Sequence, residues 1–450
     1  MVFCLLPSVG MLFFPTTQTT ENKAMAEAPK LFTEDGSFNT SLIADFEDYF
    51  TQHIALRNQL IYADAQIQTK LFQESNVSGV IAGTKGWLYY SSTLSDYLGL
   101  EVLSDRDLFN LANNFAIVQN YLGRQNIRFA LTIPPNKNTL YGENMPYYKS
   151  YVVDPDHSAQ LLAPYLEEQG VRYLDLFQLF EEQDETLYLL RDSHWNMKGA
   201  CMAYDAILDI LEVPHEDYAS VTPTLVKNEN GDLNKMLYSF YGPLEENYDY
   251  GLTQEYTYTS GDDVEDGWIV TENENGSGTL LMFRDSFANT LIPFFSNEFQ
   301  TVYYSKGEPN ALARLVETHN PELVVIEKVE RNISNYLDTP PILMPNKAAL
   351  PSNFTIAETE SSVQMEGCMY DFNYYLISGT VDADRVEVDS HVLVSVDGRT
   401  YRAYLAGESG YSVYVKKDTF LEPTTEVQVY VVTGDHCVQV LSTELQLPAE

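Results

Sequence analysis

The sequence predicts a three-layer α/β domain followed by an all-β sandwich. Up to about residue 335, apolar runs of strand length alternate with stretches whose apolar residues recur at helical spacing. Such alternation is typical of helices packed on both faces of a mostly parallel sheet. Beyond the prolines between 340 and 351, apolar and polar residues alternate with a period of two, which indicates half-buried strands. These two patterns and the proline-rich break between them predict the fold.

In the first part, helices and strands take turns along the chain. The spacing of apolar residues predicts helices over 41–73, 104–123, 157–168, 197–211 and 310–318. Buried strands are predicted over 127–133, 171–176, 187–190, 280–283, 300–304 and 323–327. Residues 213–275 show no simple alternation and are rich in Tyr, Glu, Asn and Gly, so we expect an insertion that lies over the active face.

The second part reads as a small sandwich, and its immunoglobulin-like character is an expectation from the strand pattern. Period-two alternation predicts strands over 374–381, 391–396, 400–405, 411–415, 426–432 and 438–445. Asp397-Gly398 separates the second strand from the third, and this dipeptide is a strong signal for a two-residue hairpin turn.

These patterns divide the chain into four regions. We expect an apolar N-terminus and linker over 1–40, an α/β catalytic domain over 41–339, a linker over 340–352 and the sandwich over 353–450. The apolar run 2–14 is too short to span a membrane, which takes about 20 residues, and it lacks a basic leading region. It is either the remnant of a signal or anchor or an apolar disordered end.

Charge and cysteine content exclude several classes of function. The 450 residues include 26 basic and 65 acidic ones, giving a net charge of −39, so nucleic acid is a poor partner. The cysteines Cys4, Cys201, Cys368 and Cys437 form no C-x-x-C pair, which argues against a zinc or redox motif. Cys201 falls on an apolar helix face and is predicted to be a buried thiol, and a Cys368–Cys437 disulfide stays open.

Two polar corners, each directly after an apolar run, carry the predicted chemistry. Asp192-Ser193-His194-Trp195 follows the run 187–190, and Asp285-Ser286-Phe287 follows the run 280–283. Carboxyl ends of parallel strands meet at one edge of a sheet, where ligands and catalytic groups collect. A serine becomes a good nucleophile when an imidazole takes its proton and a carboxylate orients the imidazole. The sequence therefore predicts a catalytic triad of Ser286, His194 and Asp192 from the two corners together, whereas each fragment alone is a weak signal and His194 alone would favour a structural or surface role.

Further candidates flank these corners. The run 127–133 ends in Pro134-Pro135-Asn136-Lys137-Asn138, so Asn136 and Lys137 are candidates for binding an oxyanion or the substrate. A solvated loop lysine is the alternative for Lys137. Arg284, which precedes the serine corner, is a third candidate.

Four segments resemble a known family. Gly83-Thr84-Lys85-Gly86-Trp87-Leu88-Tyr89, the Asp192–Trp195 corner with Gly199-Ala200, Gly231-Asp232-Leu233, and Asp285–Asn289 with Pro293-Phe294 are similar, in this order, to motifs of the SGNH-hydrolase-like proteins of bacterial polysaccharide O-acetylation. This is the AlgX/AlgJ-like family, with the related DHHW proteins of Gram-positive bacteria. The resemblance covers roughly residues 40–335, and placing the Asp/His pair before the Ser implies the permuted SGNH order. Trp87 is expected either to line the site or, by preference, to anchor packing.

The resemblance implies an acyltransferase that uses neither metal nor cofactor. It implies a polysaccharide acceptor, a membrane O-acyltransferase that supplies acetyl, and a place outside the cell or in the envelope, anchored through the N-terminus or secreted. Two other functions stay open. The same triad would serve a carbohydrate acetylesterase, and a degenerate site would leave a glycan-binding assembly protein. The acceptor glycan, the acyl donor and the oligomeric state are not predicted.

Overall fold

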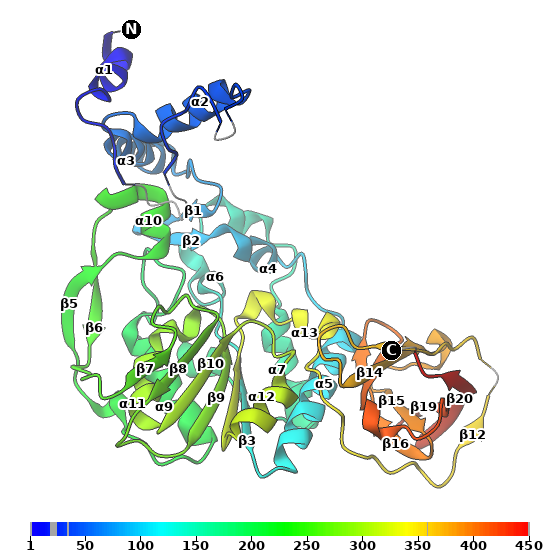
Figure 1. Ribbon diagram of the computed structural model, residues 1–450. Helices are drawn as coiled ribbons and strands as arrows, with labels where there is room; N and C mark the ends of the chain where they lie inside the picture. Colours follow the sequence, from blue (N-terminus) through cyan, green and yellow to red (C-terminus); the bar gives the residue numbers. More distant parts are fainter. Residues whose placement is uncertain (1, 19–24, 34–35, 358, 449–450) are drawn as a thin grey trace.

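The computed structural model describes residues 2–18, 25–33, 36–357 and 359–448. An N-terminal arm of α1 (Val2–Gly10), α2 (Leu42–His53) and α3 (Arg57–Ile67) projects from the body, and the sandwich lies beside the α/β part (Figure 1). The helix predicted over 41–73 is thus broken between α2 and α3, where Leu56 adopts a left-handed conformation with φ of 61°.

A seven-stranded sheet forms the centre of the α/β part. Its order is β4-β3-β11-β9-β10-β8-β7. The first five strands run parallel, whereas β8 and β7 are added antiparallel at one edge. The strands are β3 (Arg128–Thr132), β4 (Tyr173–Leu174), β7 (Thr257–Ser260), β8 (Trp268–Glu272), β9 (Thr279–Arg284), β10 (Thr301–Lys306) and β11 (Leu323–Glu327). The carboxyl ends of β3, β11 and β9 therefore lie together.

Helices cover both faces of this sheet. On one face α5 (Asp105–Gly123), α7 (Ser158–Glu168) and α12 (Leu312–His319) pack against Leu131, Leu281 and Val324. On the other face α9 (Met197–Ile210) and α11 (Ile292–Glu298) pack against Leu280, Met282 and Val325. Successive strand residues thus enter opposite cores, as the pleat requires, and the predicted three-layer arrangement is confirmed.

The C-terminal part is a sandwich of two sheets, as predicted. One has the order β12-β20-β19-β15-β16 and the other β13-β14-β18-β17. The strands are β12 (Thr355–Ile356), β13 (Gln364–Gly367), β14 (Tyr374–Thr380), β15 (His391–Val396), β16 (Arg399–Arg402), β17 (Tyr404–Ala406), β18 (Gly410–Lys416), β19 (Thr424–Thr433) and β20 (His436–Gln446).

Local detail in the sandwich both follows and departs from the pattern. Asp397 and Gly398 have φ of 47° and 72°, and positive φ at both positions is the signature of the predicted type I′ hairpin turn. The single strand predicted over 400–405 is two strands, because the chain passes from one sheet to the other at Ala403. Cys201, Cys368 and Cys437 are all buried free thiols, so Cys201 is as predicted and no Cys368–Cys437 bond forms.

Buried amides on α5 connect the two parts of the molecule. The side chains of Asn110, Asn113 and Asn114 donate to the carbonyls of Gly407, Ala403 and Leu405, at 2.8 to 3.0 Å. Ser104 caps the helix start by accepting the N–H of Asp107. Polar residues on a helix buried on nearly every side therefore have backbone partners in the sandwich.

Smaller elements surround the carboxyl edge of the sheet. Three small units lie between the arm and the sheet (Figure 1). They are the hairpin of β1 (Val80–Ala82) and β2 (Leu88–Tyr90), the antiparallel pair of β5 (Thr224–Glu229) and β6 (Glu245–Asp249), and α10 (Asp232–Tyr238), which connects β5 to β6. Short helices α4 (Leu94–Leu98), α6 (Lys137–Leu140), α8 (Leu176–Glu181) and α13 (Asn335–Asp338) complete the α/β part. Of residues 213–275, the stretch up to β6 stands outside the sheet, whereas β7 and β8 extend it.

Candidate active site

The Asp192 corner does not follow a sheet strand, so the strand predicted over 187–190 is wrong. This segment makes only an isolated bridge between Tyr188 and Trp195. Side chains accept hydrogen bonds from its backbone instead. The N–H of Leu187 donates to the Tyr141 hydroxyl, and the N–H of Leu190 donates to a carboxylate oxygen of Glu245. The run is apolar because its side chains enter the core, and burial alone does not specify strand pairing.

The serine corner follows β9 as predicted, and Asp285 fixes its shape. The carboxylate of Asp285 accepts the N–H groups of Phe287 at 2.9 Å and Val329 at 2.8 Å, and its own N–H donates to Glu327. A 3-10 turn, Phe287–Thr290, follows directly. Asp285 is therefore committed to the loop, while Ser286 stays partly exposed at the edge of the sheet.

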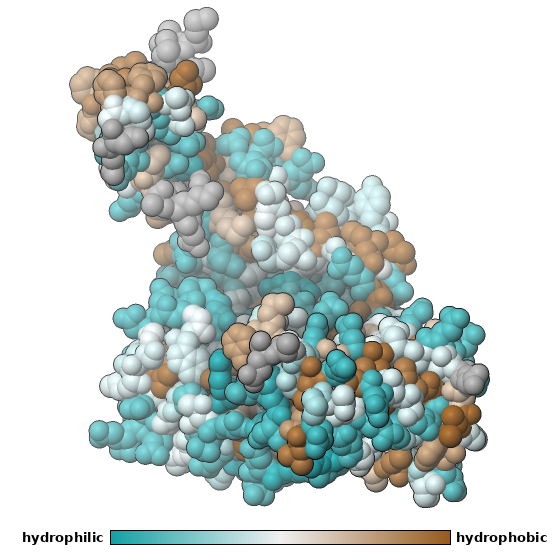
Figure 2. Space-filling model, turned by 45° about the vertical axis from the view of Figure 1, so that its right-hand side comes forward, coloured by the Kyte–Doolittle hydropathy of each residue, from teal (hydrophilic) through white to brown (hydrophobic). Residues whose placement is uncertain are grey.

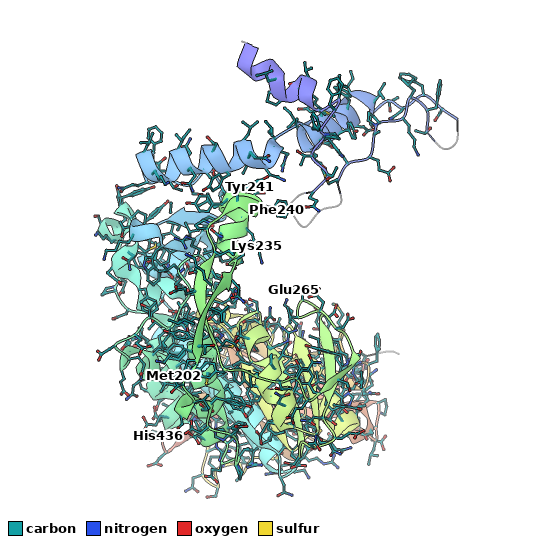
Figure 3. All side chains as sticks on the ribbon, turned by 90° about the vertical axis from the view of Figure 1, so that its left-hand side faces the viewer. Met202, Lys235, Phe240, Tyr241, Glu265 and His436 are labelled. Carbon is teal, nitrogen blue, oxygen red and sulfur yellow. The ribbon has the colours of Figure 1, made fainter. Side chains whose placement is uncertain are left out.

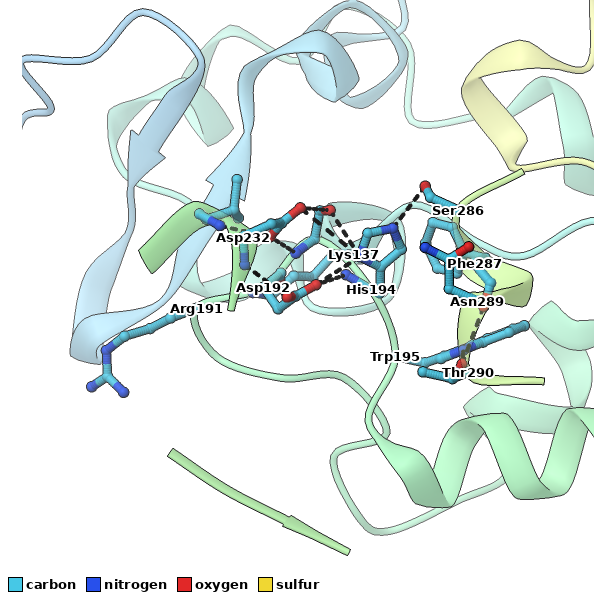
Figure 4. Close-up of polar contacts among 12 residues, drawn as sticks. Lys137, Arg191, Asp192, His194, Trp195, Asp232, Ser286, Phe287, Asn289 and Thr290 are labelled. Carbon is cyan, nitrogen blue, oxygen red and sulfur yellow. Dashed lines mark hydrogen bonds and ion pairs between the residues drawn. The ribbon is translucent and has the colours of Figure 1, made fainter. Parts of the chain in front are cut away.

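The two corners meet. The Oγ of Ser286 lies 2.8 Å from Nε2 of His194, and Nδ1 of the same ring lies 2.7 Å from Oδ1 of Asp192 (Figure 4). Ser286 and His194 are 92 positions apart in the chain. Both distances are hydrogen bonds, so a hydroxyl, an imidazole and a carboxylate lie in one continuous line that can pass a proton.

A second carboxylate, that of Asp232, supports the first. The backbone N–H of Asp232 donates to Oδ2 of Asp192 at 2.8 Å, while its side chain accepts the N–H of Ser193 at 2.8 Å and the Ser193 hydroxyl at 2.5 Å. A Cβ at Gly231 would lie 2.4 Å from the Arg191 carbonyl oxygen, which explains glycine at this position. The segment 231–233 thus packs directly on the Asp192 corner.

A buried lysine fixes the corner from the other side. The Nζ of Lys137 donates to the carbonyls of Leu88, Leu190 and Asp192 at 2.7 to 2.9 Å. It lies 5.0 Å from the centre of the Trp87 ring, which is itself buried and packs on neighbouring tyrosines. These contacts favour the packing interpretation of Trp87, and they show that Lys137 is not a solvated loop residue.

Aromatic packing holds the imidazole and its helix. The ring of Phe287 contacts that of His194 edge to face at 4.8 Å, and Trp195 packs on Phe287 and donates its Nε1 hydrogen to the Thr290 hydroxyl. A Cβ at Gly199 would lie 2.7 Å from the Leu187 carbonyl oxygen, so glycine lets α9 approach the segment before the corner. Packing therefore explains why tryptophan stands at position 195 and glycine at position 199.

Comparisons with known proteins identify part of the chain. Residues 80–270 match the family model described as the SGNH hydrolase-like domain of the acetyltransferase AlgX. This region is therefore similar to the SGNH hydrolase-like domain of AlgX. The family resemblance seen in the motifs is thereby confirmed. The match includes Asp192, His194 and Asp232 and ends before Ser286.

Several solved structures are also similar to this chain, each with a TM-score below 0.5. Bacillus cereus PatB1 is 18% identical with a TM-score of 0.44, over 56% of this chain and 96% of that chain. The O-acetyltransferase domain of Pseudomonas putida AlgJ is 18% identical with a TM-score of 0.40, over 57% and 92%. Pseudomonas aeruginosa AlgX is 12% identical with a TM-score of 0.37, over 80% and 94%. No curated protein matches the sequence.

Electrostatics in the SGNH hydrolase-like domain suit a charged carboxylate beside an imidazole. Burial raises the pKa of Asp192, but the hydrogen bond and charge of His194 outweigh burial and lower that pKa to about 2. Burial lowers the pKa of His194, yet its hydrogen bond to Asp192 and the nearby charges of Asp192, Asp232 and Asp285 raise it overall. The pKa of Asp232 is raised, first by burial and then by the charge of Asp192. The imidazolium form of His194 is therefore stabilised in place.

The three predicted oxyanion or substrate candidates have other partners. The side-chain amide of Asn136 donates to Asp96 at 2.8 Å, and its Oδ1 accepts from Arg331. The guanidinium of Arg284 donates to the Asn289 side chain at 2.6 Å and to the Val264 carbonyl at 2.8 Å. With Lys137 bound to carbonyls, none of the three is hydrogen-bonded to Ser286 within the described residues. Their contacts are those of residues that shape loops, because burial demands a partner for every polar group.

One group in the described part of the chain presents three possible metal-ligand atoms within 4.8 Å of one another. It consists of Asp192, His194 and Asp232. The ligand atoms of this group accept protein N–H and O–H groups or bond to one another, as described above. These oxygen and nitrogen atoms are thus already hydrogen-bonded within the protein.

Glu265 lies on a loop beside the serine corner. Figure 3 shows Lys235 of α10 and Phe240 apart from Glu265. Glu265 accepts from the side chain of Asn289, three residues after the serine, at 3.0 Å.

Proposed function

We propose that the protein is an O-acetyltransferase that moves an acetyl group through an acyl-Ser286 onto a sugar hydroxyl of an extracellular or cell-wall polysaccharide. The observation that carries this proposal is the hydrogen-bonded line from Asp192 through His194 to Ser286, at 2.7 and 2.8 Å. The family-model match over residues 80–270, to the domain of an acetyltransferase, supports acyl transfer as the reaction class.

In the first half-reaction Ser286 takes the acetyl group. Its Oγ attacks the carbonyl carbon of an acetyl ester while its proton moves to Nε2 of His194. The tetrahedral intermediate then collapses, the ester C–O bond breaks, and the leaving alcohol takes the proton from His194. Asp192 holds the ring through Nδ1 and stabilises the imidazolium that forms between these steps.

In the second half-reaction a sugar hydroxyl gives its proton to Nε2 of His194 and attacks the acyl-serine. An ester to the sugar forms, the bond to Ser286 breaks, and the serine recovers its proton. Water in place of the sugar would make the same site an acetylesterase. The acceptor that reaches His194 therefore decides between transfer and hydrolysis.

The negative charge on the intermediate needs hydrogen-bond donors near Ser286. Within the described ranges, the backbone N–H of Ser286 has no hydrogen-bond partner, so it is free to donate. The side chains of Asn136, Lys137 and Arg284 are engaged elsewhere. We therefore assign the serine's own N–H to the oxyanion.

The proposal includes an acetyl donor and a location. We propose that a membrane O-acyltransferase supplies the acetyl group and that the protein works in the cell envelope or outside the cell. No described helix is long and apolar enough to cross a membrane. The projecting arm exposes apolar side chains, including those of Phe13, Phe14, Ile43 and Phe46, whereas much of the body in Figure 2 is hydrophilic. This arm is the part that suits attachment to an envelope surface.

One experiment separates the candidate functions. Wild type and Ser286→Ala are incubated with an activated acetyl ester, with and without an oligosaccharide. Acetylated sugar from wild type alone supports transfer, whereas acetate alone supports an esterase. Equal ester turnover by both proteins would mean that Ser286 is not the nucleophile and would favour a glycan-binding protein. Labelling by a fluorophosphonate, expected for wild type and not for Ser286→Ala, is an independent check.

A further inference from the structure

A cavity of about 1120 Å³ lies where α5, β3 and α7 meet the linker to the sandwich, and basic residues line it. Five of the 18 lining residues are basic and one, Glu167, is acidic. In the whole chain the balance is reversed, at 26 basic to 65 acidic residues. We call this cavity the basic groove and define it by Arg124, Arg128, Arg172, Lys347 and Arg402.

The charges of the basic groove are unpaired. None of its five basic side chains forms an ion pair with a described residue, whereas Lys198, Lys306, Lys328 and Lys416 elsewhere each contact a glutamate. The guanidinium of Arg128 donates to the carbonyls of Leu211 and Glu212, and that of Arg124 to the carbonyl of Lys347. These partners orient the side chains and leave the positive charge uncompensated.

Arg402 shows most clearly that a counter-charge is missing. It is largely buried, and it contacts only neutral partners in Asn113 and Gln169, both at 2.6 Å, and His391 at 3.0 Å. Burial lowers its pKa to about 10, so it is still charged at neutral pH, while burial and Arg402 hold His391 neutral. A buried charge without an opposite charge is costly. An anion in the groove would supply that opposite charge.

The groove lies at the amino ends of the parallel strands, whereas Ser286 follows the carboxyl end of β9. Arg128 begins β3, and through β11 it is in register with Leu280 near the start of β9, four residues before Arg284. This spacing corresponds to roughly 13 Å along the strands. A ligand in the groove therefore cannot be the group that reacts at Ser286, although a long chain could reach both places.

The lining favours an acidic sugar chain among anionic polymers. Guanidinium groups match carboxylate and phosphate oxygens, and Asn120, Asn126 and Asn346 add amides that can hydrogen-bond hydroxyls. The only aromatic lining residue, Phe129, is buried in the core, so the groove lacks the stacking faces that bind single-stranded nucleic acid. Its volume exceeds the about 300–1,000 Å³ of most small-ligand sites, which suits several linked sugars.

We propose that the basic groove binds a segment of an oligosaccharide that carries carboxylate or phosphate groups. The choice of a sugar chain rests on the proposed function, whereas the anionic character rests on the groove alone. Binding there, away from the serine, would retain an acidic polymer on an otherwise negative protein while its hydroxyls are acetylated elsewhere along the chain.

Binding measurements by calorimetry test this proposal on the full chain. The probes are hexagalacturonate, a sugar-phosphate oligomer of similar length, neutral maltohexaose and a single-stranded oligonucleotide. The test variant is Arg124→Gln/Arg172→Gln/Lys347→Gln, which leaves the buried Arg402 intact. The matched control is Lys70→Gln/Lys149→Gln/Arg385→Gln, which removes the same charge from exposed positions outside the groove.

We expect wild type to bind one or both acidic oligomers, with an affinity that falls as salt rises. The groove variant should bind at least tenfold more weakly, and the control within twofold of wild type. Which oligomer binds identifies the acidic group. The proposal fails if neither binds, if maltohexaose or the oligonucleotide binds as well, or if both variants lose affinity equally. Ser286→Ala should bind like wild type even though it lacks ester turnover, so failure of the groove and failure of the catalytic proposal are distinguishable.

Discussion

The backbone N–H of Asp232 donates a 2.8 Å hydrogen bond to Oδ2 of Asp192, the oxygen that does not hold the imidazole. Both oxygens of the orienting carboxylate are therefore fixed, one by the ring and one by the first turn of α10. The side chain of Asp232 adds two bonds to Ser193, between Asp192 and His194. Through these contacts α10 sets the position of the proposed triad.

Asp232→Ala should lower kcat with little change in KM. The variant keeps the backbone bond to Asp192 and loses both bonds to Ser193, and one lost hydrogen bond of about 1.5 kcal/mol corresponds to roughly a tenfold slower reaction. Ser193→Ala removes one of the same bonds, so the double variant should be little slower than Asp232→Ala. Strictly additive losses in this cycle, measured as ester turnover, would show that the two residues act independently.

Asp192→Asn should change both the rate and its pH dependence. Asp192 raises the pKa of His194, so wild-type activity should rise with pH through a value above the ordinary 6.5, where the ring becomes neutral and able to take the serine proton. In the variant this midpoint should move lower, and kcat should fall by about 10³- to 10⁴-fold because the tautomer is no longer fixed. An unchanged midpoint in the pH–rate profile would mean that the carboxylate does not act on the ring.

Lys137→Met tests the buried ammonium. The substitution keeps an apolar side chain of similar length but removes the donor to three backbone carbonyls, one of which belongs to Asp192. We therefore expect kcat to fall about tenfold or more, with KM nearly constant. Burial lowers the pKa of Lys137 to about 7, so the ammonium is present below that pH and is lost above it. Wild-type activity should therefore decline on the alkaline side, and the variant should lack this decline. Exposed Lys149→Met is the control, and an equal effect there would refute the role.

Gly231→Ala should disturb the site more than the fold. An added Cβ would meet the backbone of Arg191 at 2.4 Å and the Cβ of Asp192 at 2.7 Å, so the corner must shift away. We expect ester turnover to fall at least tenfold while the melting temperature changes modestly. Gly367→Ala, where no atom lies within 4 Å of the added Cβ, should leave turnover unchanged. Equal turnover in the two variants would contradict the close packing of α10 on the corner.

Sequence reasoning predicted the layers and the meeting of the corners because each depends on local signals. Continuous apolar runs predict the buried strands β9 and β11, Asp397-Gly398 predicts its turn, and the motifs around His194 and Ser286 follow the ends of apolar runs. The type of each long element depends mainly on which of its residues are buried. The periodic pattern of the sequence carries this information.

The features that the sequence did not predict depend on hydrogen-bond partners that are distant in the chain. Residues 187–190 look like a strand, but Tyr141 and Glu245 satisfy their backbone, and no local signal reveals such partners. Asn136, Lys137 and Arg284 were predicted as oxyanion or substrate candidates from loop position alone. Their hydrogen bonds to Asp96, to the Asp192 carbonyl and to the Val264 carbonyl join distant segments that the sequence does not link. Asp232 was noted only as part of a motif, because its contact with Asp192 joins segments 40 residues apart. The glycine before it was the available signal for close packing.

The formation of an acyl-serine can be observed by mass spectrometry of the protein after brief incubation with an activated acetyl ester and an acid quench. We expect one added acetyl group, located by peptide mapping on Ser286, that disappears when an acceptor oligosaccharide is supplied before the quench. His194→Ala should show no such adduct, because the line from Oγ to Nε2 at 2.8 Å is removed. An acetyl group found on another residue would contradict an acyl-Ser286 intermediate. Ester turnover without any adduct, undiminished in Ser286→Ala, would contradict it as well.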